Sequence, residues 1–148
     1  MHKKLRPLLV SILFLPAISL AWDDIDKDLG ALSTNIREVW SGGHWELEDA
    51  NGFYRFVVAG GGYEHYKSKL YVQWIRHGSD MELPVVIETT EVIELNANPI
   101  YAFGLPECAG GWECSEIEVN AMHAYEHTQH KFRVLFRGVG RYEFKNAL

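Results

Sequence analysis

The sequence lacks the short motifs that mark the best-known catalytic sites. It contains no Gly-x-Ser-x-Gly nucleophile turn, no glycine loop followed by a helical pattern, and no His-Glu-x-x-His pair. The glycine run at residues 59–62 precedes a strand-like pattern, so it predicts a flexible hairpin loop and not a phosphate cradle. We therefore expect a protein that is not an enzyme and that binds no cofactor.

Positive charge is also scarce. The 148 residues carry 14 Lys and Arg against 20 Asp and Glu, which gives a net charge of −6. Three of these cations, Lys3, Lys4 and Arg6, stand at the extreme N-terminus. Phosphate backbones and anionic lipids repel a protein of this charge, so nucleic acid and membrane surfaces are disfavoured as partners. A basic protein partner fits the charge.

The chain has no uninterrupted apolar run of the roughly 20 residues that a membrane-spanning helix needs. Its most apolar stretch, residues 8–20, follows a charged start, contains a proline and ends in a small-residue pattern at Ser19 and Ala21. These features predict a secretory signal peptide over residues 1–21. No cysteine follows the cleavage point to carry a lipid. We therefore expect an exported protein, periplasmic or secreted, that begins at Trp22 without membrane insertion after cleavage.

Cysteine occurs only twice, at Cys108 and Cys114. The spacing differs from the Cys-x-x-Cys redox motif, and no second pair suggests a metal site. In an exported protein such a pair predicts a disulfide, with reactive thiols as the alternative. A bridge that closes so short a loop contributes roughly 2 kcal/mol to stability.

Residues 22–148 are enough for one domain and too few for two ordinary ones. Near its start, residues 24–40 predict a helix, because apolar side chains recur at steps of four and three. These side chains are Ile25, Leu29, Leu32, Ile36 and Val39. The aspartates in the first turn do not predict an EF-hand, since the glycine and glutamate that such a loop needs are missing.

From about residue 44 onward the sequence predicts β-strands. Short runs that alternate polar with apolar residues, such as residues 69–74 and 116–121, are separated by glycines and other turn residues. Residues 84–95 predict one long bent strand or two short ones. Seven or eight short antiparallel strands favour a single, mainly β domain, built as an antiparallel β-sandwich or a small barrel.

Two segments of this β region resemble each other. Residues 63–78 align without a gap on residues 125–140 with six of sixteen positions identical, and the apolar residues keep the same alternation. A duplicated hairpin unit, which would make the domain pseudo-symmetric, explains the match. Chance similarity between two amphipathic hairpins is the alternative.

Three histidines, His123, His127 and His130, lie within eight residues. On a helix they would share one face and could bind a metal ion. The surrounding pattern is that of a strand, on which His123 and His127 would lie about 13 Å apart. The two similar hairpins share the segment Tyr-Glu-His, at residues 63–65 and 125–127. We interpret it as structural turn chemistry, with a polar binding patch or a zinc or copper site as alternatives, and we expect no metal.

The aromatic residues supply candidates for binding. Trp45 and Trp112 lie beside glycine pairs, where a side chain is often exposed and able to anchor a partner or a sugar ring, although both could instead cover the core. We expect an exported, non-enzymatic β domain that binds a protein, such as an inhibitor or immunity protein. The alternative is a module that binds carbohydrate or metal. The candidate binding residues are Trp45, Tyr63, His65, Trp112, Tyr125, His127 and His130.

Overall fold

The computed structural model describes residues 30–79 and 82–147. The predicted signal peptide and the predicted start at Trp22 lie outside these ranges. The chain divides into two compact units, Met1–Leu32 and Ser33–Leu148, and all the described strands belong to the second unit. No helix within the described ranges is long and apolar enough to span a membrane.

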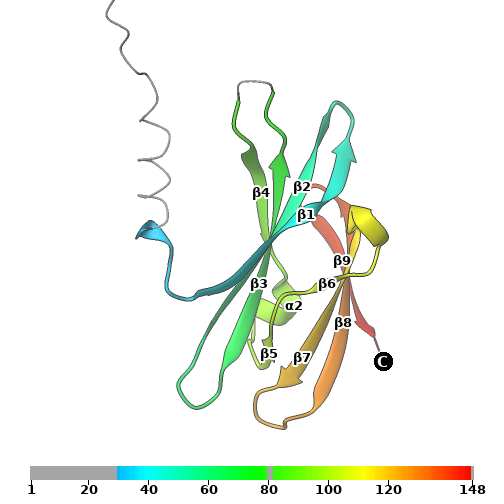
Figure 1. Cartoon of the computed structure of the whole chain (residues 1–148). Coiled ribbons are helices and arrows are strands. Elements are labelled where there is room, and N and C mark those ends of the chain that lie inside the picture. The colour runs from blue at the N-terminus through cyan, green and yellow to red at the C-terminus, as the bar shows by residue number, and fades with distance from the viewer. Residues whose placement is uncertain (1–29, 80–81, 148) are drawn as a thin grey trace, which may run out of the picture. The chain divides into compact units, whose positions relative to one another are not determined.

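The second unit is mainly β, as the sequence predicts, with two antiparallel sheets (Figure 1). Sheet A has the order β1 (Ile36–Leu47), β2 (Ala50–Gly61), β3 (Lys67–Arg76) and β4 (Val85–Glu91). Sheet B has the order β5 (Tyr101–Phe103), β7 (Glu116–His123), β8 (Gln129–Gly138) and β9 (Arg141–Ala147), and β6 (Glu107–Cys108) also pairs with β7. The short helices α2 (Ile93–Asn96) and η1 (Gly111–Glu113) lie in the connections.

The structure contradicts the second half of the predicted helix over residues 24–40. Residues 24–29 lie outside the described ranges, but Ile36 already begins β1, which pairs with β2 along its length. The strands therefore start at residue 36 and not near residue 44. The helical spacing misleads because Val39 is exposed, whereas its neighbour Trp40 stacks on Phe56 with ring centroids 5.3 Å apart. Long-range pairing of β-branched and aromatic residues overrides the local pattern.

Gly43 forms part of a bulge inside β1. The register between β1 and β2 shifts between Gly42 and Trp45, and Gly43 has a positive φ of 71°. A Cβ at this position would lie 2.7 Å from the Cβ of Cys114, so glycine lets β1 approach the disulfide loop. After the bulge Trp45 points into the core, where its ring packs over Gly52.

Both sheets contribute side chains to one hydrophobic core. The rings of Tyr54 and Trp74 from sheet A lie 4.8 Å and 5.7 Å from the ring of Phe136 in sheet B. Full burial of one large apolar side chain is worth about 1.5–3 kcal/mol, so these contacts stabilise the association of the sheets. The buried positions alternate along four strands: Tyr54, Phe56, Val58, Leu70, Val72, Trp74, Ile117, Val119, Ala121, Phe132, Val134 and Phe136.

Two buried polar side chains connect β3 to its neighbours: Ser68 bonds to β5 of sheet B, and Asn96 of α2 bonds back to β3. Ser68 Oγ donates to the carbonyl of Phe103 at 2.8 Å and accepts from its N–H at 3.0 Å. Asn96 Oδ1 accepts from the N–H of Leu70 at 2.8 Å, and its Nδ2 donates to the Leu70 carbonyl at 2.9 Å. These groups replace the strand neighbour that this part of β3 lacks. Residues 84–95, predicted as one or two strands, instead form β4 and the first residues of α2.

Candidate functional site

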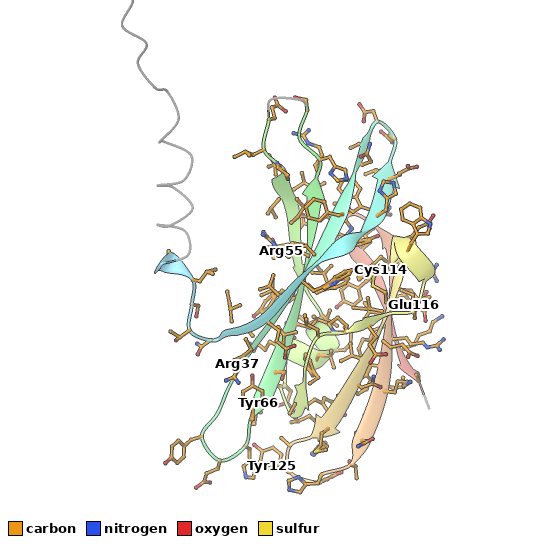
Figure 2. All side chains as sticks on the ribbon, in the orientation of Figure 1. Arg37, Arg55, Tyr66, Cys114, Glu116 and Tyr125 are labelled. Atoms are coloured by element: carbon orange, nitrogen blue, oxygen red, sulfur yellow. A yellow bond between two sulfur atoms is a disulfide. The ribbon has the colours of Figure 1, made fainter. Side chains whose placement is uncertain are left out.

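The two Tyr-Glu-His segments form the turns after β2 and β7, and these turns meet (Figure 2). The ring of His65 lies 4.6 Å from the ring of Tyr125, and Lys67 Nζ lies 5.0 Å from the centroid of the same ring. Tyr63 is fully exposed, and His127 is exposed with a positive φ of 57°. Of the predicted binding residues, the fold thus brings His65 and Tyr125 into contact between the two turns, whereas Tyr63 lies outside this contact.

The other histidines of this end surround Tyr101. The rings of His123 and His130 lie 5.6 Å and 5.2 Å from the Tyr101 ring. His123 Nδ1 accepts two backbone N–H groups of the following turn, and His130 Nε2 lies 3.0 Å from Thr128 Oγ1. Within the described residues no three His, Cys, Asp or Glu side chains are arranged to hold a metal ion. Through its two hydrogen bonds to backbone N–H groups, His123 holds the turn that follows β7.

A groove of about 910 Å³ lies at the same end of sheet B and is lined by β5, β7, β8 and β9. Its lining residues include Tyr101, Phe132 and Asn146, and also Asn120 and Gln129. Phe132 and Asn146 form a cross-strand pair on the inner face of the sheet, whereas Asn120 and Gln129 belong to its outer face. None of the described residues that line the groove is Asp or Glu. The chain carries 20 Asp and Glu residues, and one of them, Glu107, lies 3.5 Å from the side-chain amide of Asn120.

The predicted disulfide between Cys108 and Cys114 is present and closes the loop that contains η1. This loop carries Trp112, which is 74% exposed. Trp45 is only 6% exposed, and its Nε1 donates to the carbonyl of Phe53 at 3.0 Å. Of the two candidate tryptophans, Trp112 can act as an exposed anchor and Trp45 is a core residue.

A small hollow of about 210 Å³ lies beside Trp112 and is lined by His44, Glu46 and Glu113. The His44 ring stacks on the indole with centroids 5.4 Å apart, and His44 Nε2 lies 3.0 Å from Glu46 Oε1. Burial raises the pKa of Tyr54 to about 12, and the negative charge of Glu113 adds to this shift. The hollow thus joins an exposed indole to two carboxylates, an arrangement that attracts cations.

The strand β4 is the outermost strand of sheet A, and no strand in the described part of the chain pairs with its second edge. Three consecutive apolar residues of β4 are exposed, Val85 at 48% and Val86 and Ile87 at 40% each. Leu83, just before the strand, is 83% exposed. An unpaired edge with exposed β-branched residues is a surface on which another strand can pair.

The outer face of sheet B has a different character because its charges are paired. Glu118 accepts hydrogen bonds from Lys131 at 3.2 Å and from Arg133 at 3.1 Å, and Arg137 donates to Glu143 at 2.6 Å. These hydrogen bonds lower the pKa of both Glu118 and Glu143. The face therefore presents little uncompensated charge to a partner.

The sequence reasoning missed Glu46, the position of His44 beside Trp112 and the edge position of β4. His44 and Glu46 flank Trp45, and neighbours on a strand point to opposite faces, so recognising Trp45 as buried would have placed both outside. The edge position had no local signal, because strand order depends on pairings between residues far apart in the chain.

Comparison of the chain with protein-family models, with curated protein sequences and with solved structures finds no match. A function for this chain is therefore argued from its own residues and their geometry.

Proposed function

We propose that the protein is a non-enzymatic β domain that binds a protein partner, and that β4 pairs with an extended segment of this partner. The observation that carries the proposal is the unpaired edge of β4 with its exposed residues Val85, Val86 and Ile87. A free edge offers backbone donors and acceptors to another chain, and the alternating side chains give the contact its specificity. Lysine commonly protects such edges, and residues 82–91 contain none.

The charge of this region supports a basic partner segment. No Lys or Arg occurs between Arg76 and Lys131, whereas Glu82, Glu88 and Glu91 flank the apolar residues of β4. A segment that alternates apolar residues with Lys or Arg complements both features. An inhibitor or immunity protein that blocks a basic target would have this chemistry.

The compartment supports a partner outside the cytoplasm. The Cys108–Cys114 disulfide favours an oxidising environment, such as a periplasm or the outside of a cell. The signal peptide predicted over residues 1–21 leads to the same place. We therefore propose that binding takes place after export.

The test uses a synthetic probe peptide of alternating lysine and valine, with an alternating glutamate and valine peptide for comparison. Hydrogen exchange should show protection of β4 amides by the lysine peptide, and Val85→Lys should weaken its binding roughly ten-fold. Val39→Lys is the matched control, because Val39 is also 48% exposed but lies on β1, at the other edge of sheet A. Equal losses in the two variants, or no protection on β4, would contradict the proposal.

A second candidate function is the binding of an uncharged oligosaccharide in the groove of sheet B. The observation that favours it is that Asn146 lines the groove with the aromatic residues Tyr101 and Phe132, and that no described lining residue is Asp or Glu. Amides hydrogen bond with sugar hydroxyls, and aromatic rings pack on sugar faces. In affinity electrophoresis with hydroxyethyl cellulose, glycol chitin and soluble starch, combined Tyr101→Ala and Asn146→Ala should abolish retardation while Trp112→Ala leaves it intact. Retardation that survives the double substitution would exclude the groove.

We also infer that the two sheets form a β-sandwich that arose by duplication of a hairpin. The residue numbers of equivalent strand ends differ by 62: β2 ends 62 residues before β7 ends, and β3 begins and ends 62 residues before β8. The buried residues Leu70, Val72 and Trp74 correspond to Phe132, Val134 and Phe136. Phe56 pairs with Val72, and Ile117 pairs with Val134, the equivalent of Val72. Phe56 in β2 is therefore equivalent to Ile117 in β7, at an offset of 61 residues. One residue inserted in the second turn accounts for this difference.

A further inference from the structure

We propose that His44, Glu46, Trp112 and Glu113, which we call the Trp112 site, bind one arginine side chain of a basic protein partner. The site is distinct from the partner strand proposed for β4, because His44 and Glu46 belong to β1 at the opposite edge of sheet A. The inference therefore does not depend on the role of β4.

The indole of Trp112 supplies the platform for a planar cation. It is 74% exposed, although a large apolar side chain on a small domain is ordinarily buried. The stacked His44 ring, inclined by 21° to the indole, supports it and limits its rotation. A guanidinium group is planar and weakly hydrated, so it stacks on an aromatic ring better than a lysine ammonium group does.

Two carboxylates of the site supply the countercharge. Glu46 and Glu113 line the hollow with Trp112, and no Lys or Arg is among the described residues that line it. The hollow of about 210 Å³ suits a single side chain and is too small for a folded ligand. A carboxylate can accept two parallel N–H bonds from arginine, which lysine cannot provide.

The backbone around the site is held in place before any ligand binds. The disulfide ties both ends of the η1 loop, and Cys114 is fully buried. Gly43 lies so close to this loop that a Cβ would meet Cys114 and the carbonyl of Glu113 at 2.7 Å and 2.8 Å. β1 and the loop therefore keep a fixed relation, and binding loses little conformational entropy in the protein.

The experiment titrates the full exported chain with the capped peptide acetyl-Gly-Arg-Gly-amide and follows by NMR the indole N–H resonance of Trp112 and the backbone amide resonances of residues 109–115, which also report binding in the variants. The resonance is assigned by its loss in Trp112→Phe. Because the site is shallow and exposed, we expect a dissociation constant on the order of millimolar. Trp112→Ala should abolish the site-specific shifts, and Glu46→Gln or Glu113→Gln should each weaken binding roughly two- to five-fold. Glu64→Gln, the same charge change on the exposed turn after β2, should have no effect.

Peptide variants separate the chemistry of the site from general charge attraction. The citrulline peptide keeps the shape of arginine without its charge and should not bind, and the lysine peptide should bind more weakly than the arginine peptide. Free arginine should also bind more weakly, because its own carboxylate is repelled by Glu46 and Glu113. Binding of the citrulline peptide, tighter binding of free arginine, or unchanged binding in Trp112→Ala would each overturn the proposal.

Discussion

Asn96 should be one of the most sensitive positions of the fold, although it lies in a helix of four residues. It is 2% exposed, and its side chain satisfies the N–H and the carbonyl of Leu70 at 2.8 Å and 2.9 Å. The Leu70 carbonyl has a second donor, because it also accepts from the N–H of Val92 at 3.0 Å. The Leu70 N–H donates to Asn96 and, among the described residues, has no second acceptor. Asn96→Ala therefore leaves one buried donor unpaired.

The size of the effect follows from these two bonds. An orphaned buried donor costs about 1–3 kcal/mol, and loss of the second bond costs about 0.5–1.5 kcal/mol because its acceptor keeps one partner. Together they predict a loss of about 2–4 kcal/mol in the free energy of unfolding. In a domain of this size that loss lowers the thermal midpoint by on the order of 10 °C.

The assay is urea denaturation at several pH values, with Asn120→Ala as the control. Asn120 is exposed, and its side chain makes a contact of 3.5 Å with Glu107. Asn96→Asp sharpens the test, because its carboxylate would face the Leu70 carbonyl in the dry interior, which raises the pKa of the new aspartate above its ordinary value of about 3.9. This variant should be least stable at neutral pH and regain stability as pH falls through that raised pKa. A loss below about 0.5 kcal/mol in Asn96→Ala, or no pH dependence in Asn96→Asp, would refute the reasoning.

Two further predictions concern the disulfide and an ionisable core residue. Reduction of the Cys108–Cys114 bridge should lower the free energy of unfolding by roughly 2 kcal/mol, measured by thermal unfolding with and without reductant; an unchanged midpoint would contradict this. For Tyr54, whose pKa rises to about 12, the unfolded state ionises first on going above the ordinary pKa of about 10. The free energy of unfolding should therefore fall between about pH 10 and pH 12. The fall should be smaller in the Tyr54→Phe variant than in the Tyr63→Phe variant, because Tyr63 is fully exposed in the folded protein. Equal falls in the two variants would show that Tyr54 does not contribute.

The alternation of residues predicted the strands well wherever one face is buried. On β3 and β8 the predicted apolar positions, from Leu70 to Trp74 and from Phe132 to Phe136, are the buried ones. The prediction failed at β1, where both faces near Val39 are exposed and the pattern by chance imitates a helix. Local periodicity reports burial, so it carries least information in strands at the edge of a sheet.

The candidate site was predicted less well than the fold, since it depends on which segments meet in space. His65 and Tyr125 were predicted as members of equivalent turns, but their contact depends on how the two sheets pack. Trp45 and Trp112 have similar local sequences, yet the bulge at Gly43 turns Trp45 into the core while the disulfide loop exposes Trp112. Residues at which long-range packing decides the side-chain direction are not readable from neighbours in the chain.

The distribution of charge argues that a basic partner approaches sheet A. On sheet B, Glu118 and Glu143 are paired with cations and cancel much of their field. Glu88 and Glu91 on β4 and Glu113 beside Trp112 form no ion pair with any described residue, and the cations of sheet A, such as Arg55 and Lys69, lie mainly on its inner strands β2 and β3. The exposed apolar residues of β4 lie beside Glu88 and Glu91, and the exposed Trp112 lies beside Glu113. Long-range attraction would therefore orient a basic partner toward β4 and the Trp112 site. Added salt should lower the association rate constant and have little effect on the dissociation rate constant.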